Sequence, residues 1–98
     1  MLNPGTSSGL KTTDTAIIAM PGRLLSVHLI TDGLAACTLT IYDNASAASG
    51  LVLAKLAVPI GVRYLEAGLP EEGIVANAGI YADVSGAGAE YIVSYTLS

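Results

Sequence analysis

The sequence is short of the residues that usually build and cover a small globular protein. Its 98 residues contain no Phe and no Trp, and only 12% of them are charged, against about 25% in an average soluble domain. A domain of this size is mostly surface, so Ala, Thr, Ser and Gly must cover what charged residues normally cover. Because large exposed apolar surface usually marks an interface, the composition favours a protein that is partly covered by other protein.

Basic residues are also scarce, which argues against two classes of partner. The net charge is −4, and the basic residues, Lys11, Arg23, Lys55 and Arg63, are scattered along the chain. Nucleic acid needs clustered Lys and Arg opposite its phosphates, and an anionic membrane surface attracts the same residues. No apolar run approaches the ~20 residues that span a bilayer. We therefore expect neither nucleic acid nor a membrane as a partner.

The single cysteine, Cys37, excludes a disulfide within the chain. The first residues, MLNPGTSSGLK, have neither the basic nor the apolar segment of a secretory signal peptide, so we expect none. Both observations favour a protein made in a reducing compartment. They also argue against glycosylation of the Asn44-Ala45-Ser46 motif, which matters only in a secreted eukaryotic chain.

Gly and Pro divide the rest of the chain into short stretches rich in Val, Ile, Leu, Thr and Tyr. Several stretches alternate apolar and polar residues, which predicts strands at 15–20, 23–31, 37–43, 51–58, 62–69, 73–84 and 90–97, with Gly79 as a bulge or a point of close approach. Short strands at such regular spacing are typical of a sandwich or a barrel. We predict an all-β fold, a single antiparallel β-sandwich of about seven or eight strands, either jelly-roll or Ig-like.

We expect the sandwich domain to span residues 11–98 and residues 1–10 to form a flexible or partner-ordered arm. The arm is rich in Gly, Ser and Pro, and only Leu2 and Leu10 offer apolar anchors. Ordering it costs roughly 1–2 kcal/mol per residue, whereas burying two leucines returns about 3–6 kcal/mol. The arm therefore needs backbone hydrogen bonds to a preformed sheet edge, which we place on a neighbouring subunit.

Few residues could carry catalysis or bind a metal. His28 and Cys37 could form a nucleophile–base pair, but Cys37 shares an apolar strand face with Leu39 and Ile41, where a cysteine acts as a small hydrophobe. A zinc site within one chain would need two carboxylate ligands as well, and a His28 cluster on an oligomer axis is a further alternative. We predict no enzymatic activity, no cofactor and no metal, and we expect His28 and Cys37 to be dispensable.

Two short segments imitate ligand loops. The sequence SGAGAE at 85–90 looks like a phosphate-binding glycine loop, but it lacks the strand–GxGxxG–helix context and a following Lys-Ser/Thr, so we predict a tight hairpin turn. The sequence PEEG at 70–73 carries two adjacent carboxylates, Glu71 and Glu72, whose side chains diverge on an extended segment. A solvated turn is favoured there over a calcium site.

The stretch YDNASAASG at 42–50 separates two apolar strands with small and polar residues. Asp43 and Asn44 favour the start of a turn because their side chains bond to their own backbone, and Gly50 ends the excursion. Small side chains let another backbone approach closely. We predict an ordered connecting loop that packs on a neighbour.

The five tyrosines supply all the aromatic mass of the protein. A buried Tyr hydroxyl needs a hydrogen-bond partner, so tyrosines suit the margin of a core or an interface. Together with the arm and the loop at 42–50, they give the predicted interface residues, which are Leu2, Leu10, Tyr42, Asn44, Tyr91 and Tyr95.

Three pieces of the sequence, PGRLLSVHLIT, CTLTIYDNASAASG and AGIYADVSGAGAEYIVSY, resemble a group of small phage virion proteins. The shared features are a Pro-Gly-Arg-Leu strand start, a Tyr-Asp-Asn loop that ends in Ser-Gly, and a Gly-Ile-Tyr…Ser-Gly…Tyr close. Together the pieces extend from residue 21 to residue 95. The resemblance implies a short β-sandwich on the particle surface, either a capsid cement (decoration) protein or part of a fibre or knob.

Cement proteins commonly form trimers and bind between capsomers, and binding the assembled shell but not its separate parts stabilises the shell by mass action. The resemblance therefore implies a homotrimer that contacts the major capsid protein or another virion protein, is made in the host cytoplasm and lies on the capsid surface. The alternative is a carbohydrate- or receptor-binding β-sandwich module of a phage tail or head fibre. Such a module would use exposed aromatic platforms, which five Tyr and no Trp supply poorly.

Overall fold

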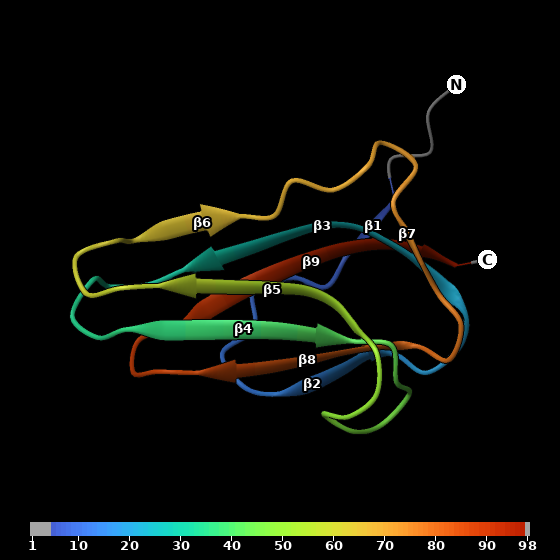
Figure 1. Ribbon diagram of the computed structural model, residues 1–98, viewed down its shortest axis with the longest axis horizontal. Helices are drawn as coiled ribbons and strands as arrows, with labels where there is room; N and C mark the ends of the chain where they lie inside the picture. Colours follow the sequence, from blue (N-terminus) through green and yellow to red (C-terminus); the bar gives the residue numbers. More distant parts are fainter. Residues whose placement is uncertain (1–4, 98) are drawn as a thin grey trace.

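Two antiparallel sheets packed face to face make up the protein (Figure 1). The computed structural model describes residues 5–97, and within that range it has nine strands and no helix, hence no helix that could cross a membrane. The strands are β1 (Thr6–Ser7), β2 (Thr15–Ile18), β3 (Gly22–Ile30), β4 (Cys37–Tyr42), β5 (Val52–Val58), β6 (Tyr64–Glu66), β7 (Ile74–Ala76), β8 (Ile80–Ser85) and β9 (Glu90–Leu97). The predicted all-β sandwich is confirmed.

The strands pair in a nested order. The β3 sheet has the order β1-β9-β3-β6, with β7 also on β3, and the β4 sheet has the order β2-β8-β4-β5. Thus β4 pairs with β5, β3 with β6 and β7, β2 with β8, and β1 with β9, so the chain resembles a long hairpin that is wrapped into two sheets. This nesting is the jelly-roll arrangement, one of the two topologies that the sequence left open.

The core lies between the two sheets and is built from medium-sized side chains. Leu24, Val27 and Leu29 of β3 are fully buried, as are Leu39 and Ile41 of β4. Every second residue of a regular strand faces the other sheet. In β3 the register shifts between Leu24 and Ser26, so Leu24 and Val27 are both buried although they are three residues apart. With no Phe or Trp in the sequence, Tyr91 is the largest fully buried side chain.

The burial of Tyr91 corrects one predicted interface residue. Its side chain is 0% exposed, and its hydroxyl donates a 2.6 Å hydrogen bond to the backbone oxygen of Thr13. A phenol can be buried in this way because its one polar group reaches a backbone acceptor at the margin of the core. Tyr91 therefore has no surface to offer a partner, and the prediction is wrong for this residue.

The N-terminal segment also differs from the prediction. Residues 5–11 lie along the free edge of β9 in the same chain, where the Ser8 amide donates to the Val93 oxygen at 2.7 Å, and Lys11 and Tyr91 exchange two backbone bonds of 2.8 Å. The segment does need a preformed sheet edge, as expected, but its own domain provides that edge. The predicted placement on a neighbouring subunit is therefore wrong for residues 5–10.

The two predicted leucine anchors of the arm have different outcomes. Leu2 lies outside the described residues. Leu10 is exposed, at 54% of its surface, so it does not anchor the segment to the domain. A contact between Leu10 and a partner stays a prediction.

The predicted strand at 73–84 is divided into β7 and β8 because the chain crosses here from one sheet to the other. Gly79 lies at the crossing. A Cβ atom on Gly79 would be 2.5 Å from the carbonyl oxygen of Ile18 and 3.0 Å from that of Asn44. The predicted close approach at Gly79 is confirmed, and any larger residue would push these segments apart.

We predict that Ser8→Ala destabilises the protein. The half-buried Ser8 hydroxyl accepts a 2.9 Å hydrogen bond from the Val93 amide, and leaving such a donor unsatisfied costs about 1–3 kcal/mol. The melting temperature, followed by circular dichroism, should fall by roughly 4–8 °C per kcal/mol for a domain of this size. The control is Ser7→Ala, whose hydroxyl accepts only an exposed 3.0 Å bond from Gly9 among the described residues. Equal melting temperatures for the two variants would contradict this role of the segment.

Candidate functional site

The structure separates the residues that could have formed a catalytic pair. His28 lies on the outer face of the β3 sheet, between the buried Val27 and Leu29, whereas Cys37 is buried in β4 of the other sheet. The Cys37 thiol faces the backbone oxygens of Ala35 at 3.5 Å and Ala87 at 3.6 Å. Within residues 5–97, no group of three or more His, Cys, Asp and Glu side chains is placed to hold a metal ion.

The two segments that imitate ligand loops are turns. Residues 86–89 connect β8 to β9 by a short turn, but the two strands belong to different sheets and do not pair with each other. The hairpin predicted for the glycine-rich stretch is therefore wrong. In the segment at 70–73, the Gly73 amide donates a 2.9 Å hydrogen bond to the Pro70 oxygen and closes a turn. The predicted solvated turn at 70–73 is confirmed, with Glu71 and Glu72 both exposed.

A cluster on the outer face of the β3 sheet was not foreseen. The Nδ1 atom of His28 lies 2.6 Å from the Tyr64 hydroxyl and 3.5 Å from Oε2 of Glu66, and the two rings are 5.9 Å apart. Partial loss of solvent and the negative charge of Glu66 raise the pKa of Tyr64 above its usual value. The cluster fastens the short edge strand β6 to β3. It depends on strand pairing, so the sequence pattern carried no signal for it.

Asp43 fastens the crossing between the sheets. Its carboxylate accepts bonds from three successive backbone amides, those of Asn77 at 3.0 Å, Ala78 at 2.8 Å and Gly79 at 3.4 Å. These bonds favour the charged form, and the bond from Ala78, the strongest influence, lowers the pKa of Asp43 below its usual value. The loop at 43–50 is therefore tied to the start of β8.

Asn44 orders the same loop from within. Its side-chain oxygen accepts bonds from the amides of Ser46 at 2.9 Å and Ala47 at 3.0 Å, and its side-chain nitrogen donates to the Ser49 backbone oxygen at 3.1 Å. The predicted ordered connecting loop is confirmed. The side-chain amide of Asn44 makes its hydrogen bonds within the loop. Contact of this loop with a neighbour stays a prediction.

The remaining predicted interface residues keep part of their surface. Tyr42 is half-buried on the outer face of the β4 sheet, directly opposite Tyr81 of β8. Tyr95 is half-buried where β9 meets β1. Both are accessible to a partner, and their role at an interface stays a prediction.

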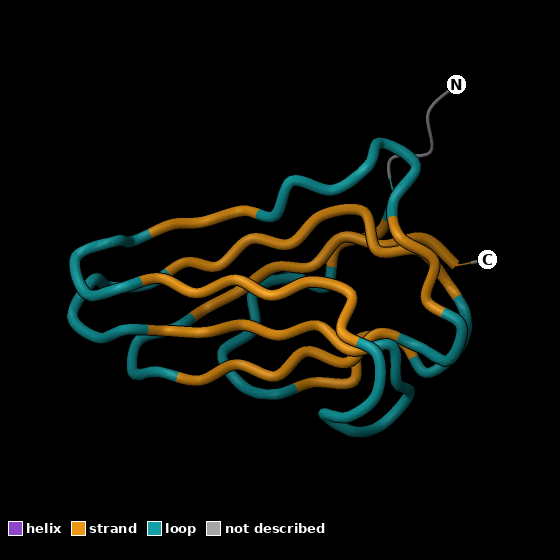
Figure 2. Tube along the Cα trace, in the orientation of Figure 1, coloured by secondary structure: helices purple, strands orange, loops and turns teal. Residues whose placement is uncertain are grey.

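The two most exposed large apolar side chains and a third, less exposed one lie together at one end of the sandwich, in the β3–β4 and β5–β6 loops, which lie side by side (Figure 2). Leu34 is 78% exposed, Ile60 69% and Val62 37%. We call these three residues the aliphatic tip. They come from two segments that are far apart in the sequence, and only the fold brings them together.

Hydrogen bonds hold the two loops of the aliphatic tip in place. The Gly61 amide donates to the Gly33 oxygen at 2.9 Å, and the Thr31 amide to the Arg63 oxygen at 2.9 Å. The Thr31 hydroxyl donates to the Val62 oxygen at 2.8 Å. The tip is therefore an ordered apolar surface, presented to solvent on a rigid base.

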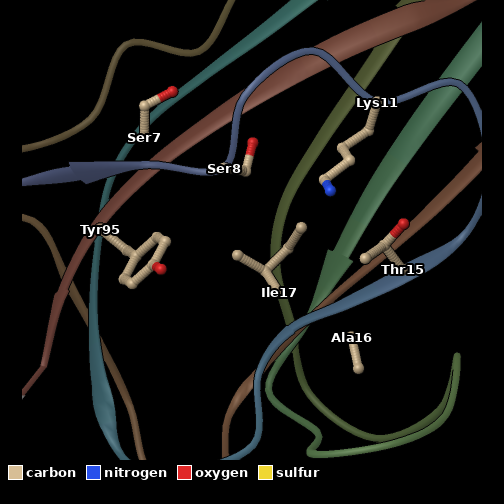
Figure 3. Close-up of a pocket in the computed structure, with 7 residues that line it drawn as sticks. All are labelled: Ser7, Ser8, Lys11, Thr15, Ala16, Ile17 and Tyr95. Atoms are coloured by element: carbon tan, nitrogen blue, oxygen red, sulfur yellow. The ribbon is translucent and has the colours of Figure 1, made fainter.

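A small pocket lies elsewhere, between β1, β9 and β2 (Figure 3). It has a volume of about 150 Å³ and is lined by Ser7, Ser8, Lys11, Thr15, Ala16, Ile17 and Tyr95. Of these, only Tyr95 was among the predicted interface residues. The pocket depends on the N-terminal segment lying against β9, which the sequence did not predict.

Comparison of the chain with protein-family models, with curated proteins and with solved structures finds no match.

Two aspartates should affect the pH dependence of stability in opposite directions. The lowered pKa of Asp43 means that its contribution is complete above its usual pKa of 3.8 and is lost as the pH falls through the folded-state value. Two features of its surroundings raise the pKa of Asp83. The larger effect comes from its partial burial, and the smaller from the nearby Asp14 carboxylate. The charged form of Asp83 therefore opposes folding, and this cost appears as the pH rises through the folded-state value.

We predict that Asp43→Asn unfolds at lower urea concentration than the wild type at pH 7, and that Asp83→Asn unfolds at higher concentration. As the pH falls, the Asp83→Asn difference should shrink first, because the pKa of Asp83 is raised above 3.8. The Asp43→Asn difference should persist to lower pH, because the pKa of Asp43 lies below 3.8. Urea unfolding of the wild type, Asp43→Asn and Asp83→Asn, from pH 7 down into the acid range, measures both differences. A shift of both variants in the same direction at pH 7 would contradict the assignment.

Proposed function

We propose that this protein is a non-enzymatic structural component of a phage virion, a capsid cement protein that binds other protein through the aliphatic tip. The observation that carries the proposal is the tip itself, in which Leu34 and Ile60 are largely exposed on loops held by backbone hydrogen bonds. Large aliphatic side chains on ordered loops suit a protein partner, because their burial is favourable and the loops lose little freedom on binding.

The remaining surface fits the same role. On the outer face of the β4 sheet, Thr38 lies between Ala57 of β5 and Ser85 of β8, so small side chains leave this part of the face shallow. The chain also has few charges. A weakly charged surface of small residues lets a neighbour approach closely at little desolvation cost.

The sequence resemblance supplies the setting. It supports a homotrimer on the capsid surface, in contact with the major capsid protein or another virion protein. A protein that binds the assembled shell and not the separate capsomers stabilises the shell in proportion to the logarithm of its concentration over its dissociation constant. Neither a cofactor nor a reaction is needed for this function.

A second candidate is the carbohydrate- or receptor-binding module, and the His28–Tyr64–Glu66 cluster favours it. Two rings beside a carboxylate on an accessible sheet face are the kind of groups that orient a sugar. The cement role is preferred because His28 and Tyr64 already bond to each other at 2.6 Å. Binding to a glycan array that is lost in Tyr64→Ala would support the module and contradict the cement role.

The cement role is tested with phage heads that lack this protein. We predict that the double variant Leu34→Ser, Ile60→Ser binds heads about tenfold more weakly or worse, since each Leu or Ile that a partner buries contributes up to about 1.5–3 kcal/mol. Co-sedimentation with purified heads measures the affinity. The control is Met20→Ser, which removes an apolar side chain of 51% exposure from the connection between β2 and β3.

The control should bind heads as the wild type does. Circular dichroism should show that all three proteins fold and melt alike, because the substituted side chains are exposed. Undiminished binding by the double variant, or an equal loss with Met20→Ser, would contradict attachment through the aliphatic tip.

A further inference from the structure

The pocket between β1, β9 and β2 lies where the open edges of the two sheets come together. Within residues 5–97, β1 is paired on one side only, with β9, and β2 on one side only, with β8. An edge strand presents backbone N–H and C=O groups that are free to bond to another chain. The pocket is thus bordered on two sides by edges that can receive an extended polypeptide.

Lys11 provides the charge of this pocket. Figure 3 shows its side chain directed inward, between Ser8 and Ile17, while the Tyr95 hydroxyl is directed towards Ile17 from the other side. The backbone of Lys11 is fixed by its two 2.8 Å bonds with Tyr91. Among residues 5–97, Lys11 forms no ion pair. Lys11 is half-buried as a residue, and its ammonium group, without a counter-charge, is available to an anionic ligand.

The hydroxyl groups around Lys11 differ in whether their hydrogen is already used in a hydrogen bond within the protein. The Ser8 hydroxyl donates to the Gly9 oxygen at 2.8 Å, and the Thr15 hydroxyl to the Thr13 oxygen at 3.0 Å. The Tyr95 hydroxyl has no hydrogen-bond partner among residues 5–97. The ammonium of Lys11 and the hydroxyl of Tyr95 are therefore two donors that approach one small space from opposite sides.

The size and charge of the pocket select the ligand. A volume of about 150 Å³ holds roughly five water molecules at ~30 Å³ each, which suits the end of one side chain and excludes a drug-sized molecule. One cation and neutral hydroxyls match a single negative charge. A phosphate carries nearly two, and proteins usually meet it with clustered Arg or Lys, which a chain of net charge −4 lacks here.

We propose that this pocket binds the carboxylate of a Glu side chain from an extended segment of the protein partner. The carboxylate meets Lys11 and Tyr95, the methylene groups lie on Ile17, and the backbone of the segment runs beside the open edge of β2. Glu fits better than Asp because Ile17 offers apolar contact below the charged groups. The proposal takes from the proposed function only that the partner is a protein.

Two matched peptides test it, acetyl-Thr-Val-Glu-Val-Thr-amide and the same peptide with Gln in place of Glu, each titrated into the ¹⁵N-labelled full chain and followed by NMR. The Glu peptide should shift the amides of Ser8, Lys11 and Ile17. The Gln peptide should bind about tenfold more weakly or worse, because a charge-assisted bond becomes a neutral one. Absence of shifts with millimolar Glu peptide overturns the proposal.

Variants assign the effect to the pocket. Lys11→Gln should weaken binding of the Glu peptide about tenfold or more, and Tyr95→Phe should weaken it by a smaller factor. The control is Lys55→Gln, which makes the same change of charge on β5, at the far edge of the other sheet, and should bind as the wild type does. Equal losses in Lys11→Gln and Lys55→Gln would indicate a net-charge effect and would overturn the site.

Two small probes separate the sources of a carboxylate. If sodium acetate binds as tightly as the Glu peptide, the pocket is a site for a free anion, and if glucuronate binds more tightly than the peptide, it is a site for an acidic sugar. Either result overturns the peptide assignment. Because this experiment uses peptides and not phage heads, its failure leaves attachment through the aliphatic tip untouched, and the converse also holds.

Discussion

The pairing of β3 with β9 determines where all the remaining strands of their sheet lie. It aligns residues 22–30 with residues 90–97 and buries Leu24, Val27 and Leu29 beside Tyr91 and Val93. β1 adds to the free edge of β9, and β6 and β7 add to the other edge of β3. The paired strands are far apart in the sequence. The chain must therefore lose the conformational entropy of a long loop before the contacts between β3 and β9 stabilise the fold. The hairpins nested between them, such as β4 with β5, are local and can form first.

Alternation of apolar and polar residues was enough to predict the stretches that form β2 to β9, with β7 and β8 as one strand, and the apolar face of β4 that buries Cys37, Leu39 and Ile41. It could not choose between a jelly roll and an Ig-like sandwich, because a period of two says which face a residue takes but not which strand lies beside it. The strand β1 was missed because its formation depends on the strand beside it, which a sequence pattern does not give. Thr6–Ser7 has no pattern of its own, and its stability comes from the edge of β9. The burial of Tyr91 depends on an acceptor, the Thr13 oxygen, that lies 78 residues away in the sequence.

The surfaces assigned to binding were not visible in the sequence, since each is assembled from separate segments. The aliphatic tip combines two loops that meet through the Gly61–Gly33 backbone bond, and the pocket needs the N-terminal segment to lie against β9. The tip is apolar and lies at a loop end, whereas the pocket is polar and lies at the sheet edges. In the function proposed, the two surfaces contact different elements of the shell, which suits a protein placed between subunits.

Native-state amide hydrogen exchange tests the organising role of the β3–β9 pair most directly. The amides of His28 and Ile92, which face each other across these strands, should exchange only by global unfolding, with a protection free energy equal to the unfolding free energy from denaturant. The Ala67 amide, which bonds to the Val27 oxygen at the outer edge of β3, should exchange through a smaller opening. Protection of His28 and Ile92 no greater than that of Ala67 would contradict the account.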